Sequence, residues 1–292
     1  MNFRTLAIAF AVLALATPAL KAEPKLKALI VDGANNHGVW PRTSKMMKKY
    51  LEQTKLFKVK IATRKKGGRD PEYNPKFSNY NVVISNYNGP NWPEKTQNDF
   101  VKYMKNGGGF VVIHAANNAF SRWPEYNRII GLGGWGGRNQ KSGPYVYINT
   151  KGKLIRDTRK GGGGHHGRQH PFQIIVRKND HPVTKGMPSH WLHARDELYD
   201  LLRGPAQNMT ILATAFADKK HGGTGRHEPM IFTVKYGKGR VFHTPMGHGI
   251  VSQQCAGFVV TLQRGAEWAA TGKVTQKIPK DFPTPDKVTL RK

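Results

Sequence analysis

The sequence predicts an α/β fold with a mostly parallel central sheet and helices on both faces. Short apolar runs at 27–31, 82–85 and 110–113 are typical of strands that are buried on both sides. Between them, residues 43–54 and 96–106 carry apolar side chains at helical spacing. Strands that alternate with helices through short loops form parallel sheets covered by those helices.

The individual elements have local signals of their own. Thr43 or Ser44 is placed to cap the first helix, residues 57–63 alternate as a strand, and Gly107 ends the second helix. Further along, we expect strands at 171–178 and 210–216, a hairpin at 229–236 and 239–245, and a last helix at 252–270.

The first 22 residues predict a secretory signal. Arg4 precedes an apolar run over 6–16, and small residues follow up to Ala22. This run is shorter than the roughly 20 residues that a membrane-spanning helix needs, and no later run is long enough. We therefore expect an exported protein, periplasmic or extracellular, with no membrane span and a single domain over 23–274.

The chain is strongly basic and has one cysteine. The net charge is +29, and without Arg4 and Lys21 the remaining 45 basic and 18 acidic residues give +27. The basic residues are scattered, so they indicate solvated faces or binding of an acidic polysaccharide, and no specific nucleic-acid partner is expected. Cys255 alone cannot form an internal disulfide, so the core must be stabilised by packing.

A glycine-rich insert at about 131–164 interrupts the alternation of strands and helices. A loop of this length inside a domain is usually functional or mobile. Its glycines match neither a P-loop nor a G-x-G-x-x-G turn after a strand, so no nucleotide cofactor is expected. Residues 275–292 form a basic, proline-containing tail with little to bury, which we expect to be partly disordered.

Three histidines follow predicted strands within a few residues, namely His37, His114 and His248. Parallel strands bring their carboxyl ends to one edge, so we expect these side chains to share a pocket with Glu197 or Asp196. Imidazoles suit a divalent metal such as zinc, with His37, His114 and His248 as ligands. The same groups equally suit acid–base catalysis by His114, Glu197 and His248.

Two other features have a structural interpretation. His165, His166 and His170 lie on a glycine-rich loop, where histidines are more often solvated than ligating. Cys255 falls among small and apolar residues of the last predicted helix, so we expect it to be buried. The sequence contains no G-x-S-x-G nucleophile elbow, and nucleophilic catalysis is not expected.

Six segments stand in a recognisable order and spacing. They are NNHGVWPRT at 35–43, YMKNGGGFVVIHAANNAF at 103–120, DHPVTKGMP at 180–188, RDELYD at 195–200, PMIFTVKYGKGRVFHTPMGH at 229–248 and RGAEWAATGKV at 264–274. Together they resemble the ThuA-like family, the trehalose-utilisation domain, over about 25–274. The resemblance implies a flavodoxin-like fold of the class I glutamine amidotransferase-like superfamily. Members lack the amidotransferase cysteine, and this chain has His114-Ala115 in its place.

The resemblance also implies a role in the metabolism of sugars, notably disaccharides and their keto forms. On that basis Trp135 and Tyr199 are candidates to stack on a sugar ring, and Asn35, Asn117 and Asn118 are candidates to bond its hydroxyls. We expect an exported enzyme, a hydrolase, lyase or isomerase, that acts on a sugar or keto-sugar derivative. The alternative is a non-catalytic protein that binds a carbohydrate or a polyanion.

Overall fold

The computed structural model describes Met1 and residues 25–291. Apart from Met1, the predicted signal segment over 1–22 lies outside the described residues. The helices are α1 (Trp40–Gln53), α2 (Lys65–Gly68), α3 (Glu94–Lys105), α4 (Pro124–Ile130), α5 (Ile250–Gln254) and α6 (Ala256–Thr271), and the 3₁₀ helices are η1 (Phe77–Asn79), η2 (His114–Asn118), η3 (Gln140–Ser142) and η4 (Lys219–His221). Within these residues, no helix is long and apolar enough to cross a membrane.

One large sheet runs through the domain. Its main strands, in spatial order, are β2 (Phe57–Thr63), β1 (Leu26–Asp32), β3 (Val82–Ser85), β4 (Gly109–Ile113), β13 (Gly239–Thr244), β12 (His227–Tyr236), β11 (Met209–Phe216), β8 (His170–Val176) and β9 (His190–Asp196). The pairs from β2 to β13 are parallel, and the pairs from β13 to β9 are antiparallel. The predicted α/β class is confirmed, and the parallel strands occupy one half of the sheet.

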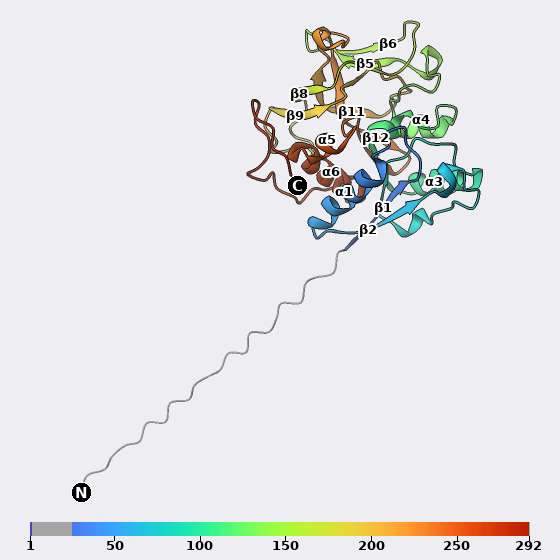
Figure 1. The fold of residues 1–292 in the computed structure, drawn as a ribbon, viewed down its shortest axis with the longest axis vertical. Helices are drawn as coiled ribbons and strands as arrows, with labels where there is room; N and C mark the ends of the chain where they lie inside the picture. Colours follow the sequence, from blue (N-terminus) through green and yellow to red (C-terminus); the bar gives the residue numbers. More distant parts are fainter. Residues whose placement is uncertain (2–24, 292) are drawn as a thin grey trace.

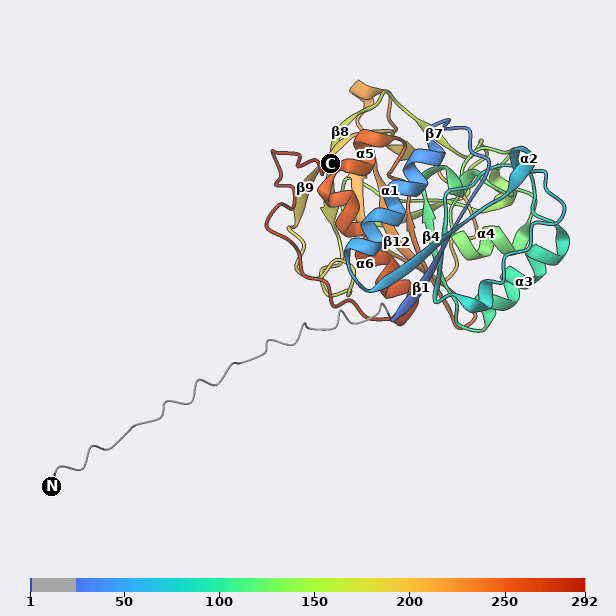
Figure 2. The same ribbon diagram turned by 60° about the horizontal axis from the view of Figure 1, so that its bottom comes forward.

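Helices cover both faces of the parallel half. Helices α1, α5 and α6 lie on one side, and α3 and α4 lie on the other (Figures 1 and 2). Strand β1 serves both sides, because Ala28 and Ile30 belong to the core beneath α1 and α6, whereas Leu29 and Val31 belong to the core beneath α3 and α4. A strand buried on both faces needs a continuous apolar run, which is the pattern that predicted it.

Two helices differ from their predicted form. Helix α1 begins at Trp40, because a proline suits the first turn, and neither Thr43 nor Ser44 caps it; both are buried within the helix. The last predicted helix is divided into α5 and α6 at Cys255, whose ψ of 123° is not helical. The Ala256 N–H donates instead to the carbonyl of Thr289 in the C-terminal tail, at 2.8 Å.

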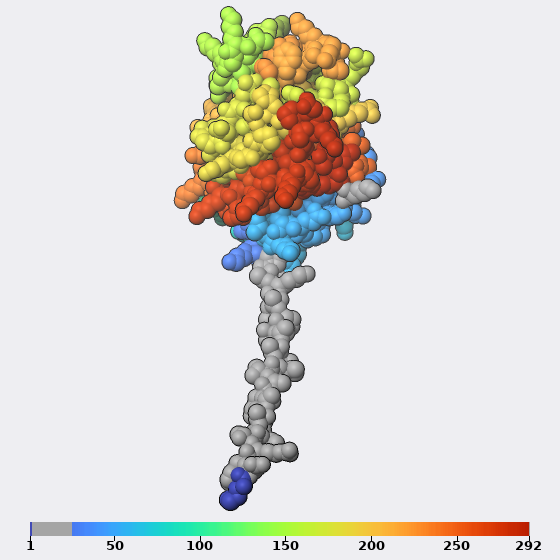
Figure 3. Space-filling view, turned by 90° about the vertical axis from the view of Figure 1, so that its left-hand side faces the viewer, coloured from blue at the N-terminus to red at the C-terminus, as the bar shows by residue number. Residues whose placement is uncertain are grey.

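The insert and the tail are both built into the domain. The insert contains a hairpin of β5 (Tyr145–Ile148) and β6 (Leu154–Asp157), and β5 pairs with β12. After the insert, β7 (His165–His166) pairs with β10 (Tyr199–Asp200) in a small second sheet. The described part of the tail lies as a red band across one face (Figure 3), and the buried Phe282 ring lies 5.4 Å from that of Trp191. The tail therefore buries more apolar surface than its composition predicts.

Candidate functional site

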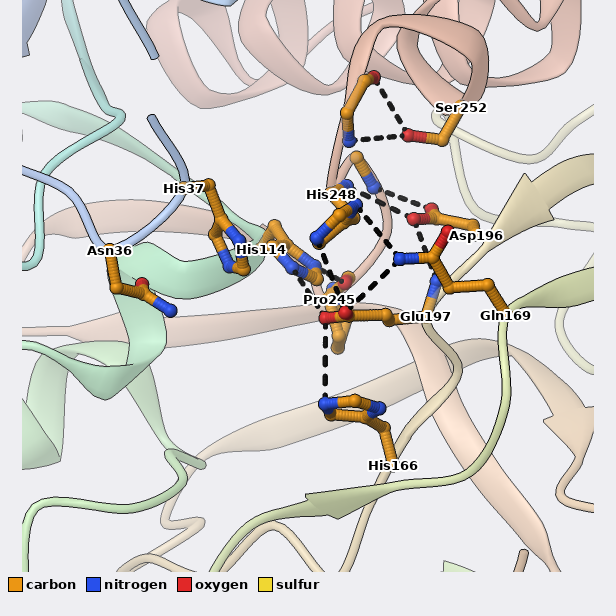
Figure 4. Close-up of polar contacts among 12 residues, drawn as sticks. Asn36, His37, His114, His166, Gln169, Asp196, Glu197, Pro245, His248 and Ser252 are labelled. Carbon is orange, nitrogen blue, oxygen red and sulfur yellow. Dashed lines mark hydrogen bonds and ion pairs between the residues drawn. The ribbon is translucent and has the colours of Figure 1, made fainter. Parts of the chain in front are cut away.

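The predicted histidines gather at one edge of the sheet. The ring centroids of His37 and His114 lie 4.9 Å apart, those of His37 and His248 lie 4.4 Å apart, and those of His114 and His248 lie 5.5 Å apart. Glu197, which follows β9, lies among them, with Oε2 3.5 Å from His114 Nε2 (Figure 4). Four segments that are far apart in the sequence thus supply one cluster.

The end of β4 holds His114 in an unusual backbone conformation. Its φ of 45° is in the left-handed region, which costs roughly 1–3 kcal/mol for a residue other than glycine and is common at functional sites. The ring Nδ1 lies 2.6 Å from the carbonyl oxygen of Pro245. Because a carbonyl can only accept, Nδ1 carries the ring proton and donates it. The other nitrogen, Nε2, therefore points at Glu197 (Figure 4).

Glu197 is the centre of the polar contacts. Its Oε1 lies 3.2 Å from His248 Nε2 and accepts from Gln169 Nε2 at 3.3 Å, while its Oε2 lies 3.8 Å from His166 Nε2. Burial opposes ionisation of this carboxyl, but the contact with His114 and the nearby His248 and His166 lower its pKa to about 2. Glu197 is therefore an anion throughout the physiological pH range.

Two of the imidazoles near Glu197, those of His37 and His248, favour their neutral form. Burial, together with the neighbouring His114 and His248, lowers the pKa of His37 to about 4. Burial also lowers the pKa of His248. A neutral imidazole can bind a metal ion or accept a proton. Among the described residues, His37, His114 and Glu197 each place one ligand atom within 4.8 Å of the others, as a metal site requires.

Behind the site, Asp196 joins two of its segments. Oδ1 accepts from the backbone N–H groups of Glu197 and His248 at 2.9 and 3.0 Å. Oδ2 accepts from the Gly247 N–H at 2.7 Å and lies 2.8 Å from His193 Nε2. Burial would raise the pKa of this carboxyl, but the contacts with His193 and the Gly247 N–H lower it. The buried Asp196 thus supports the site from behind. Glu197, the next residue, is the carboxylate that contacts the histidines.

The two aromatic candidates lie next to the histidines. The ring of Tyr199, on β10, is 4.1 Å from that of His114, and the ring of Trp135, on the insert, is 4.7 Å from that of Tyr199. Trp135 is half-buried and has a φ of 50°. Together, Trp135 and Tyr199 form what we term the aromatic wall of the site.

The three asparagine candidates have different positions. Asn35 Oδ1 accepts from the His37 N–H at 2.9 Å, so Asn35 helps to position the His37 loop. Asn118 contacts Tyr199 at the aromatic wall. Asn117 is fully buried and lies 3.2 Å from His243 Nε2 through its amide nitrogen, so it points into the core and away from the cluster.

Two histidines that the sequence indicated as solvated are paired with carboxylates. Adjacent residues of a strand point to opposite sides, so on β7 His166 faces Glu197 while His165 faces Asp200, with Nδ1 2.7 Å from Oδ1. Both side chains also remain partly solvated, with His165 46% exposed and His166 36% exposed. Two adjacent histidines were the available signal, but a two-residue strand is too short to show an alternating pattern.

The single cysteine is fully buried at the junction of α5 and α6, as predicted. Burial would raise the pKa of the Cys255 thiol, but the contact with His193, the partner of Asp196, lowers it. Cys255 is thus two residues removed from the cluster through Asp196 and does not line it.

Comparison with known proteins gives a consistent picture. The model of the ThuA family, described as trehalose utilisation, matches residues 27–269. A ThuA-like protein from Parabacteroides merdae is 50% identical, with a TM-score of 0.88 over 92% of this chain and 98% of that one. A ThuA-like protein from Bacteroides uniformis is 22% identical, with a TM-score of 0.58 over 90% of this chain and 97% of that one, and shows the same fold. No curated protein matches the chain.

Proposed function

The chain belongs to the ThuA family, described as trehalose utilisation, and we propose on this premise that it is an exported enzyme acting on a sugar or keto-sugar derivative. The reaction is a hydrolysis, an elimination or an isomerisation. His114, Glu197 and His248 carry it, and no cysteine nucleophile takes part.

The observation that supports catalysis is the gathering of three imidazoles around one ionised carboxylate. At pH 7 the low pKa values of Glu197 and His37 leave an anion beside neutral imidazole, a combination that can move protons. General acid–base catalysis by such groups contributes roughly 10²–10⁴-fold to a rate. The same side chains can hold a divalent metal ion, which would serve this chemistry equally well.

The aromatic wall supports a sugar as the ligand. Small-molecule sites are lined mainly by apolar and aromatic side chains, with a few polar groups that fix orientation. Trp135 is half-buried and is backed by the buried Tyr199 ring, so it supplies the first kind of group, while His166 and Gln169 supply the second kind beside Glu197. A pyranose ring has both a C–H face and hydroxyls, so it matches this lining.

The test is turnover of trehalose, other disaccharides and their keto forms by the mature protein, followed by chromatography of the products. We expect Glu197→Gln to lower turnover at least ~100-fold. The matched control is His190→Gln, which changes an exposed residue at the other end of β9 and should keep full turnover. Full activity of Glu197→Gln would remove this carboxylate from the mechanism.

The alternative function is binding without catalysis, of a carbohydrate or of an acidic polysaccharide. The +29 formal charge of the chain supports it. In that case equilibrium dialysis finds a bound sugar that is recovered unchanged, or finds a polymer whose affinity falls steeply with salt. Salt-insensitive binding accompanied by product formation would favour the enzyme.

Export is proposed from the signal pattern at the N-terminus. N-terminal sequencing of the protein recovered from the periplasm or medium is expected to begin between Lys21 and Pro24. Recovery there of a chain that still begins at Met1 would contradict the proposal.

A further inference from the structure

We infer that His37, His114 and Glu197 bind one divalent transition-metal ion of the zinc class, with coordination positions left open for a water or substrate oxygen. The inference deepens the proposed function, on which its catalytic meaning rests. The binding of the ion itself can be measured without any sugar.

The first argument is that a buried nitrogen without a hydrogen-bond partner faces a carboxylate. His114 Nδ1–H donates to Pro245, so Nε2 is left facing Glu197 Oε2, 3.5 Å away. An imidazole nitrogen and a carboxylate oxygen are both ligand atoms that zinc takes. His114 Nε2 has no hydrogen-bond partner among the described residues. A cation between the two atoms satisfies both.

The second argument is geometric. His37 Nε2 is likewise buried and lacks a hydrogen-bond partner within the described part of the chain. Zinc–ligand bonds of about 2.0–2.2 Å in a tetrahedral site place ligand atoms ~3.4 Å apart. His114 and Glu197 already have this separation, at 3.5 Å. The three ligand atoms lie within 4.8 Å of one another, so the His37 loop needs to close by about 1.4 Å at most.

His248 has a different role from His37 and His114, as its hydrogen bonds indicate. Gln169 Nε2 lies 3.4 Å from His248 Nδ1, and an amide nitrogen can only donate. Nδ1 therefore accepts, and Nε2 carries the proton toward Glu197 Oε1, 3.2 Å away. His248 thus orients the carboxylate that binds the ion, and Glu197 takes the ligand position that the sequence pattern suggested for His248.

The ligand set leaves the ion accessible. Three protein ligands with an open position are typical of catalytic zinc sites, whereas structural sites have four. His166 marks the open side, since its side chain is 36% exposed and its Nε2 lies 3.8 Å from Glu197 Oε2. Its Nδ1 lies 2.9 Å from the Gly167 carbonyl, so Nε2 is free to accept a hydrogen bond from an oxygen on the ion.

The experiment uses the full mature chain, freed of metal with a chelator and then titrated with Zn²⁺ or Co²⁺ alone. Calorimetry gives the stoichiometry, and the visible absorption of Co²⁺ reports the coordination. We expect one ion per chain and a rise in Tm on adding Zn²⁺. His114→Gln and Glu197→Gln should weaken binding more than ~100-fold, and His248→Gln should weaken it about 10- to 100-fold.

The matched control is His170→Gln, because His170 and His221 stack 3.7 Å apart and are the rival pair of histidines outside the cluster. This variant should bind the ion like the wild type. Circular dichroism of each metal-free variant shows whether it is folded, and His37→Gln replaces His114→Gln if the latter does not fold. A wild-type chain that binds no ion, or binding that is lost with His170 and kept without His114, overturns the inference. If one ion binds at the cluster but no sugar is turned over, the inferred metal site stands and the proposed enzymatic function is rejected.

Discussion

The Asp196 carboxylate and the His248 backbone are joined by a hydrogen bond of 3.0 Å across 52 residues of sequence. Through it, the end of β9 is tied to the segment that follows β13. Glu197 comes directly after Asp196, so the same carboxylate sets the separation between Glu197 and His248. The distances within the site therefore depend on a residue that lies behind it.

Replacing Asp196 with asparagine tests this dependence. The two carboxylate oxygens face four donors, and an amide has only one accepting oxygen, so two donors would face an NH₂ group. We expect Asp196→Asn to lower the free energy of unfolding by about 2–4 kcal/mol in urea titrations. Amide hydrogen exchange at Gly247 and His248 should quicken, while exchange at Ile30 in β1 stays the same. If the amides of Gly247 and His248 exchanged no faster in the variant, Asp196 would not hold these two segments together.

The buried His243 should make the protein less stable in acid. Its Nδ1–H donates to Ile130, Asn117 donates to its Nε2, and burial lowers its pKa to about 3. The unfolded chain, with a pKa near ~6.5, binds a proton that the folded chain does not, so this stability is full above about pH 6.5 and is lost as pH falls toward 3. Between pH 7.5 and pH 5.0 the loss from this residue is ~2 kcal/mol.

The measurement for His243 is the free energy of unfolding in urea at both pH values. His243→Gln should be less stable at pH 7.5 but should lose ~2 kcal/mol less on acidification than the wild type. The exposed His190 provides the control, since His190→Gln should keep the wild-type pH dependence. Equal losses in His243→Gln and the wild type would refute the assignment.

Cys255→Ser should leave the activity nearly intact. The thiol is fully buried between α5 and α6 and does not line the cluster. The serine hydroxyl is harder to bury, so the free energy of unfolding should fall by roughly 1–3 kcal/mol. Cys255→Ala is the companion variant, because it removes the sulfur without adding a polar group. A folded Cys255→Ser protein with no turnover would restore nucleophilic catalysis as the mechanism.

Gly164→Ala should displace the aromatic wall. Gly164 has a φ of 89°, and an added Cβ would lie 2.6 Å from the backbone nitrogen of Trp135. We expect lower turnover and a changed near-ultraviolet dichroism from Trp135, with a stability loss of about 1–3 kcal/mol. Gly162→Ala is the control, since its Cβ would meet nothing within 4 Å. The prediction fails if both variants behave like the wild type.

The parallel half of the fold could be predicted because its signals are local. The apolar runs that became β1, β3 and β4 are buried on both faces, and their bounds match the structure to within one residue at each end. The break at Cys255 could not be predicted, because it depends on a hydrogen bond from Ala256 to Thr289 in the tail. Helical propensity around Cys255 contains no information about that partner.

The site was predictable where strand ends determine it. His37, His114 and His248 follow parallel strands, and a shared sheet edge brings them together. The contacts of His166 and Gln169 with Glu197 were not predicted, because these residues lie on the segment just after the insert, which has no repeating pattern. Which imidazole nitrogens remain free depends on carbonyls such as that of Pro245, and only the three-dimensional structure shows these.

The pairing of β4 with β13 has a consequence for the order in which the protein forms during synthesis. The His114 ring is held by Pro245, 131 residues later in the chain. The centre of the sheet needs β13 beside β4, with Val111 opposite Phe242, so it cannot assemble on a nascent chain that stops before residue 240. Contacts of such long range also slow folding. Until its last fifth is made, the chain lacks its central strand pair, so every intermediate length up to that point is without the completed site.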